Sequence, residues 1–165
     1  MPMHAAKLEK RRAERGAAIE NHQRAVRVQV RLLELFLQRV KDELGLRGDC
    51  VAVRLIRDGE MARLNGKYRG KKRTTDVLSF PDGEKRQPVL RGDAARKHRG
   101  AFLGDIAISP AVAQRNAHAM GRKLPEELQI LILHGVLHLL GYDHEVDRGE
   151  MERVEMRLRR RLGIG

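Results

Sequence analysis

The sequence predicts a single domain of α/β (α+β) class. Its 165 residues are enough to form one hydrophobic core, and no internal repeat or domain linker divides them. Segments that alternate apolar and polar side chains, as strands do, are interspersed with segments whose apolar residues recur at helical spacing. The most apolar segment, residues 128–140, is apolar on nearly all sides, which predicts a helix buried in the core.

The first residues are predicted to form a separate basic tail. Residues 1–16 carry few large apolar side chains, and their cations are Lys7, Lys10, Arg11, Arg12 and Arg15. Such a segment is expected to be flexible and at most transiently helical. It can add nonspecific affinity for nucleic acid or simply be a solvated tail, and the folded domain is then residues 17–165.

The first elements of the domain are predicted to be strand, helix, strand and helix. Residues 17–21 are a weak strand candidate, and residues 49–57 alternate like a half-buried strand. Between them, Gly45 is suited to end a helix, whose apolar stripe is Val30, Leu32, Leu33, Phe36, Leu37, Val40 and Leu44. Asp58 is suited to cap a short helix that carries Met61 and Leu64.

Residues 65–73, with the sequence NGKYRGKKR, are predicted to form a basic loop. The segment has five cations and no acidic residue, and Gly66 and Gly70 give its backbone freedom. Such a loop has the charge and reach to bind phosphate, although an ordinary solvated turn fits the spacing equally well. A short strand over residues 74–81 follows, and Pro81 ends it.

The C-terminal half is predicted to contain a long charged surface loop, one strand and three helices. The loop is residues 82–101 and the strand residues 102–109. Ser109 caps and Pro110 opens a helix that reaches about Met120 and is closed by Gly121. The buried helix begins at Pro125, and the last helix, about residues 147–162, buries Met151, Val154, Leu158 and Leu162.

Three histidines in the segment HGVLHLLGYDH predict a metal site. His134 and His138 are four residues apart on the buried helix, so their rings project from one face. Gly141 can end the helix in a left-handed turn, which lets His144 complete a set of three ligands. Three imidazoles and one open position are typical of catalytic zinc. Alternatively, the three histidines have unrelated roles in the core and on the surface.

The composition favours a polyanionic partner. There are 34 Lys and Arg against 22 Asp and Glu, a net charge of +12, which suits RNA, DNA or an anionic membrane surface, or simply a highly soluble enzyme. Aromatic residues make up only 3% of the chain, so contacts to nucleic acid should be mostly to phosphates. With one cysteine, Cys50, no apolar leader and no apolar run of membrane-spanning length, we expect a soluble cytoplasmic protein.

The histidine spacing is shared with metzincin peptidases, but their catalytic glutamate is replaced by Gly135, which cannot act as a base. With its flanking residues, the segment instead resembles the YbeY family of bacterial endoribonucleases. The resemblance spans about residues 17–162 and includes segments 64–65, 68–70, 75–81, 103–106 and 134–144, together with Glu145, Met151 and Glu155.

The resemblance implies a zinc-dependent, single-strand-specific endoribonuclease that acts in 16S rRNA 3′-end maturation and ribosome quality control. It implies a small mixed sheet with the metal helix packed beneath it, and ribosomal RNA and the small ribosomal subunit as partners. His134, His138 and His144 match the ligands of one zinc ion per chain, and Arg69 matches the arginine in the family's cleft. The tail 1–16 and the loop 82–101 lie outside the family pattern.

The chemistry predicted for such a site assigns Arg69 to hold the scissile phosphate in a bidentate fork. Lys71, Lys72 and Arg73 would contact neighbouring phosphates. The general base stays open, since Asp143 or Glu145 can take a proton or merely orient an imidazole, and Asp76 can cap a turn. Two other functions are compatible with the sequence: a non-enzymatic, zinc-stabilised ribosome-assembly factor, and a metal-dependent hydrolase of another substrate.

Overall fold

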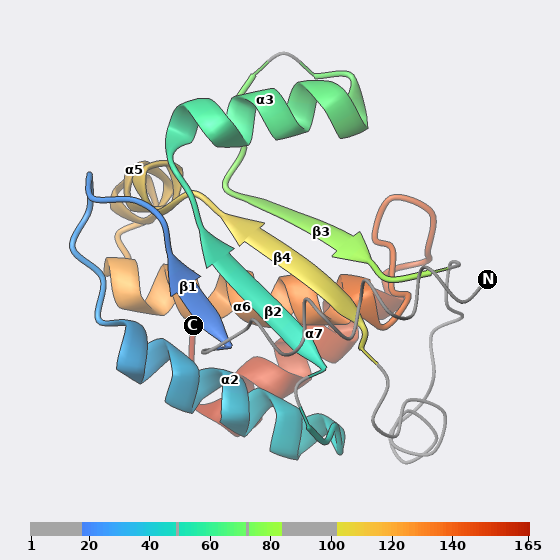
Figure 1. Ribbon diagram of the computed structural model, residues 1–165. Coiled ribbons are helices and arrows are strands. Elements are labelled where there is room, and N and C mark those ends of the chain that lie inside the picture. The colour runs from blue at the N-terminus through green and yellow to red at the C-terminus, as the bar shows by residue number, and fades with distance from the viewer. Residues whose placement is uncertain (1–17, 49, 72, 84–101) are drawn as a thin grey trace.

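The computed structural model describes residues 18–48, 50–71, 73–83 and 102–165 (Figure 1). The predicted tail 1–16 and most of the predicted loop 82–101 lie outside the described residues. In chain order the elements are β1 (Ile19–Asn21), α2 (Val30–Leu44), β2 (Val51–Leu55), α3 (Asp58–Arg69), β3 (Val77–Pro81), β4 (Gly104–Ile108), α5 (Pro110–Ala119), α6 (Leu124–Leu139) and α7 (Glu150–Leu162).

A four-stranded mixed sheet lies at the centre of the fold, with the strand order β1-β2-β4-β3. β1, β2 and β4 run parallel, whereas the edge strand β3 pairs with β4 in the antiparallel direction. Ile106 in β4 pairs with Val53 on one side and with Ser79 on the other. The predicted α/β class and the small mixed sheet are therefore confirmed.

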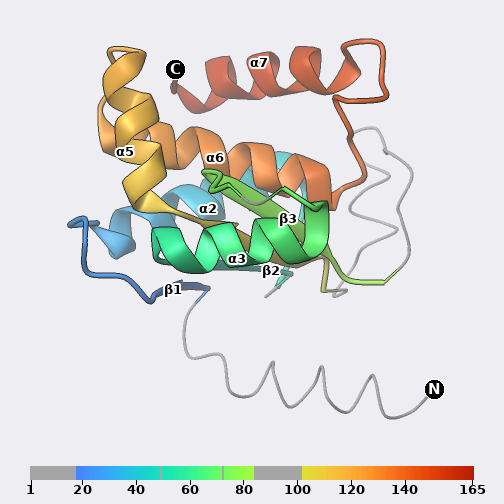
Figure 2. The same ribbon diagram turned by 90° about the horizontal axis from the view of Figure 1, so that it is seen from above.

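One face of the sheet is covered by α6 and α2, and α7 packs on the outer side of these helices. Figure 2 shows the resulting layers, with α3 and α7 at opposite ends of the stack and α6 between the sheet and α7. Val53, Leu55, Ile106 and Ile108 point from the sheet into this core, where they are at most 1% exposed. The prediction that the helix carrying His134 and His138 is buried is correct, because most of its residues from Leu128 to Leu139 belong to this core.

The opposite face of the sheet is covered by α3 through a smaller apolar cluster. Its buried members are Ile56, Met61, Leu78 and Ala107, and Leu64 and Phe80 pack against them. Because this cluster holds α3 across β3 and β4, the last turn of α3 lies on the same side of the molecule as the loop after α6 (Figure 1).

The prediction of a loop over residues 65–73 is wrong for its first half. α3 continues to Arg69, and Gly70, at φ 67°, ends the helix. Asn65 anchors this end of α3: the residue is 3% exposed, its Nδ2 donates to the carbonyl of Arg73 at 2.6 Å, and its own carbonyl accepts from the amide of Lys71 at 3.4 Å. Asp58 is also not the cap but the first helical residue.

Other helix ends follow the predicted signals closely. Gly45 ends α2 at φ 69°, and the Oγ of Ser109 accepts from the amide of Val112 at 3.3 Å at the start of α5. α7 begins at Glu150, later than predicted, because Asp147 instead accepts from the amides of Gly149 and Met151. In the described residues no helix combines the length and apolar character needed to cross a membrane.

Candidate metal centre

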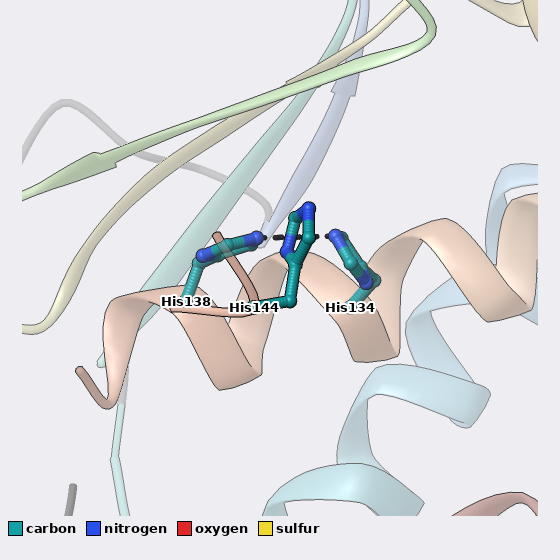
Figure 3. A group of neighbouring side chains, drawn as sticks. All are labelled: His134, His138 and His144. Carbon is teal, nitrogen blue, oxygen red and sulfur yellow. Dashed lines mark hydrogen bonds between the residues drawn. The ribbon is translucent and has the colours of Figure 1, made fainter. Parts of the chain in front are cut away.

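The three predicted histidines come together at the C-terminal half of α6. One nitrogen of each of His134, His138 and His144 lies within 4.8 Å of those of the other two. Figure 3 shows His134 and His138 rising from the helix with their Nε2 atoms facing each other, and His144 reaching the same place from the following loop. The two Nε2 atoms are 3.1 Å apart.

This arrangement fits a tetrahedral metal ion. Two nitrogens each about 2.0–2.1 Å from such an ion lie about 3.3 Å apart, close to the separation seen between His134 and His138. Imidazole nitrogens suit zinc and its first-row neighbours rather than calcium or magnesium, which prefer oxygen. Among the described residues the cluster has three members, and three histidines are a donor set typical of catalytic rather than structural zinc sites.

The turn that brings His144 back depends on Gly141. After α6 ends, the amide of Gly141 donates to the carbonyl of His138 at 3.0 Å and that of Tyr142 to the carbonyl of Leu137 at 3.1 Å. Gly141 has φ 102°, in the left-handed region that a side chain disfavours. The predicted role of this glycine is confirmed.

Gly135 faces the sheet, not the histidines. A Cβ at this position would lie 2.8 Å from Cδ1 and 2.9 Å from Cγ2 of Ile106, and the Gly135 carbonyl accepts from the Oγ of Ser79 at 3.2 Å. The glycine therefore lets α6 approach β3 and β4 closely. A glutamate here would have to displace the sheet, so the peptidase base is excluded by packing as well as by chemistry.

His138 is held in the neutral form that a metal ligand requires. Burial, together with the neighbouring His134 and His144, lowers the pKa of His138 to about 4, although a hydrogen bond with the backbone of Tyr142 acts in the opposite direction. At neutral pH the ring therefore carries a free lone pair on one nitrogen. Metal binding needs that lone pair.

Glu155 orients His134. Its Oε2 is 2.8 Å from Nδ1 of His134, and its Oε1 accepts from Nη2 of Arg159. Burial alone would raise the pKa of Glu155, but the His134 hydrogen bond and the Arg159 charge outweigh burial and leave the pKa below its ordinary value. When Nδ1 of His134 donates to this carboxylate, Nε2 is left as the acceptor that faces His138. The sequence predicts no role for Glu155 beyond its match to the YbeY pattern, although an acidic residue on the buried face of α7 is a signal for one.

Arg69 contacts the residue that follows His144, although the two contacting residues are far apart in sequence. Its Nη2 donates to Oε1 of Glu145 at 2.9 Å, and Glu145 directly follows His144. The two side chains are 44% and 56% exposed, so the pair contributes little to stability and can open. Arg69 is the last residue of a helix, not part of a loop as predicted.

The other residues that the sequence singled out are three cations and two aspartates, and those that the structure describes lie at separate places around α3, β3 and the loop after α6. Lys71 and Arg73 are exposed just beyond α3, and Lys72 lies outside the described residues. Asp76 accepts from Nδ2 of Asn116 at 3.1 Å, which ties β3 to α5. Asp143 accepts from the amide of Glu145 at 3.0 Å and so shapes the loop that carries His144.

Comparisons with known proteins point to one family. A family model described as Endoribonuclease YbeY matches residues 17–163. A protein named Endoribonuclease YbeY from Koribacter versatilis is 46% identical over 132 residues, which are 80% of this chain and 76% of that protein. One of the same name from Solibacter usitatus is 42% identical over 132 residues, 80% of this chain and 78% of that protein.

A solved structure supports the fold assignment. The solution structure of TM1509 from Thermotoga maritima superimposes with a TM-score of 0.56 at 27% identity, and the match covers 87% of this chain and 88% of that chain.

Proposed function

Because this chain belongs to the Endoribonuclease YbeY family, we propose that it is a zinc-dependent endoribonuclease that cleaves single-stranded RNA. We propose further that its substrate is the 3′ end of 16S rRNA in the small ribosomal subunit, that it acts in ribosome quality control, and that the cytoplasm is its compartment.

The observation that carries the proposal is the cluster of three histidines, together with an arginine that is paired with the residue following the third of them. A zinc ion held by three imidazoles supplies Lewis-acid activation of water or of a phosphoryl oxygen at neutral pH. His134, His138 and His144 would hold it, and three ligands without a fourth from the described chain support a catalytic rather than a purely structural site. This favours the enzyme over the zinc-stabilised assembly factor.

Arg69 supplies the second part of the site. Its guanidinium already binds one oxyanion, the carboxylate of Glu145, and Glu145 directly follows His144 in the chain. A phosphodiester can take the place of that carboxylate, because a guanidinium presents the same planar donors to either anion. Arg69 then holds the scissile phosphate next to the metal and stabilises the charge that develops on its oxygens.

The proposal is tested by cleavage of labelled RNA with metal-matched protein freed of contaminating nucleases. We expect zinc-loaded protein to cut a single-stranded 16S 3′-end fragment and to leave the same sequence intact within a duplex. Protein in which chelator has removed the metal should be inactive until zinc is restored. Tight RNA binding without metal-dependent cleavage would favour the assembly factor, whereas cleavage of a peptide or small-molecule panel alone would favour another hydrolase.

The positive charge beyond α3 leads to a prediction about salt. Replacing Lys71, Lys72 and Arg73 with glutamine should flatten the dependence of log Kd for single-stranded RNA on log salt by about 2, because up to three phosphate contacts are lost. Fluorescence anisotropy titrations from low to physiological salt measure the slope. A control with the same loss of charge, at the exposed Arg24, Arg27 and Arg31, should stay closer to wild type. Equal slopes for the two triple variants would remove the segment from the RNA interface.

The contact between Glu155 and His134 leads to a prediction about metal affinity. Glu155→Gln keeps the size of the side chain but no longer offers His134 a charged acceptor, so we expect zinc to bind about 10- to 100-fold more weakly. Competition with a chromogenic chelator gives the Kd. Glu152→Gln, on the exposed face of the same helix, is the control and should bind zinc like wild type. An unchanged Kd in Glu155→Gln would mean that the carboxylate only fastens α7 to α6.

A further inference from the structure

We propose that Tyr68, supported by Phe80 and flanked by Lys67 and Arg69, is a stacking platform for an unpaired base of the RNA strand, next to the phosphate held by Arg69. This inference rests on the proposed function and adds to it a subsite for a nucleobase.

An aromatic pair is notable in this chain, because the chain has only two tyrosines and three phenylalanines. The rings of Tyr68 and Phe80 are 5.0 Å apart between centroids, at an interplanar angle of 69°, a favourable edge-to-face contact. Phe80 packs on the apolar cluster beneath α3, so one ring of the pair is anchored in the fold. Tyr68, in contrast, is 58% exposed.

Burial of apolar surface does not explain an aromatic ring that stays this exposed. Tyr68 covers part of Phe80, but a smaller aliphatic side chain at the same position of α3 could do so as well. What the ring offers in addition is a rigid π-face whose position is fixed by Phe80. Ordering such a ring on binding costs little entropy, and every base can stack on it.

The charges around the ring match an RNA strand. Lys67 Nζ lies 5.4 Å from the Tyr68 centroid, and Arg69, Lys71 and Arg73 follow within five residues. A base that stacks on Tyr68 would take the place of the Lys67 ammonium, which can then move on its flexible stem to a phosphate. Aromatic rings among cations are the composition of surfaces that bind single strands.

The location connects the platform to the metal centre. Tyr68 immediately precedes Arg69, which reaches Glu145 beside His144. Consecutive side chains on a helix project about 100° apart, so the phosphate on Arg69 and the base on Tyr68 would belong to neighbouring parts of the same strand. A base in a duplex is already stacked and paired and cannot present its face, so the platform also gives a physical reason for a preference for single strands.

The test uses full-length zinc-loaded protein and a short single-stranded RNA with one 2-aminopurine, whose fluorescence is quenched by stacking. With wild type we expect quenching at one position of the base along the oligonucleotide. Tyr68→Leu should abolish the quenching and weaken binding by roughly 5- to 100-fold, the range for loss of one base–aromatic stack. Tyr68→Phe should restore both. The slope of affinity against salt should stay unchanged in Tyr68→Leu, since no phosphate contact is removed.

The controls separate the platform from the proposed function. Leu32→Ala removes an apolar side chain of similar exposure, 55%, from α2 and should bind like wild type. Zinc content and Tm should be the same in all variants. Normal binding and quenching by Tyr68→Leu, with wild type still cleaving RNA, would overturn the platform alone. A wild type that neither binds nor cleaves single-stranded RNA would overturn the proposed function and the platform with it.

Discussion

His138→Ala should remove high-affinity metal binding altogether. The Nε2 atom of His138 is 3.1 Å from that of His134, and its ring centroid is 5.2 Å from that of His144, so His138 is one of three rings grouped closely enough to hold one ion. Without His138 only two imidazoles are left, and a zinc site of this kind needs three protein ligands. We expect wild type to purify with one zinc ion per chain and the variant with almost none, as measured by elemental analysis without chelators.

The loss of zinc should also lower stability. A ligand that binds only the folded state stabilises it by about 4 kcal/mol when its concentration is 1,000 times its Kd. Chelator should therefore lower the Tm of wild type substantially and leave the Tm of His138→Ala unchanged. Comparing the variant with chelated wild type isolates the effect of the missing ring itself. His118→Ala, at an exposed histidine of α5, is the control and should keep its zinc. If wild type and His138→Ala are equally free of metal, the histidine cluster is not a metal site.

The elements that the sequence predicted well are those whose signals are local. α2 has a clear apolar stripe and a glycine at its end, and its bounds of 30 and 44 agree with the structure. The C-terminal half of α3 was missed because its residues Lys67, Tyr68 and Arg69 are all exposed and carry no apolar period. The end of α3 is anchored by a buried polar residue, Asn65, whose side chain donates to the carbonyl of Arg73 beyond the helix. Hydrophobic periodicity does not reveal such a contact.

The site likewise contains a part that local spacing predicted and a part that depends on contacts between distant elements. The positions of His134, His138 and His144 relative to one another follow from one helix, one glycine and a short turn, so their spacing alone predicted the cluster. The partners of those residues come from other elements: Glu155 is 21 residues from His134, and Glu145 is 76 residues from Arg69. These contacts depend on how α7 and α3 pack, which the spacing of residues cannot give. The position of Gly135 was informative in sequence as the loss of a base, but its packing against Ile106 emerged only from the fold.

Arg69→Lys should reduce cleavage of single-stranded RNA by roughly two or more orders of magnitude, the scale observed when one donor to the transition state is removed. Lysine keeps the charge but loses the planar fork that binds two phosphate oxygens at once. Binding should weaken far less, because other cations still contact the backbone. Single-turnover cleavage and equilibrium binding on the same metal-matched samples separate the two effects.

The structure adds a reason why the fold should tolerate this change. The ion pair that Arg69 makes with Glu145 is largely exposed, so its contribution to stability is at most about 1 kcal/mol, and lysine can keep part of it. Zinc content and Tm should therefore stay near those of wild type. Arg63→Lys, at an exposed arginine earlier in α3, is the matched control and should cleave normally. Normal cleavage by Arg69→Lys would remove the residue from catalysis, whereas an equal loss of binding and cleavage would make Arg69 a residue that only holds the RNA, because a group acting in the transition state affects the rate more than the affinity.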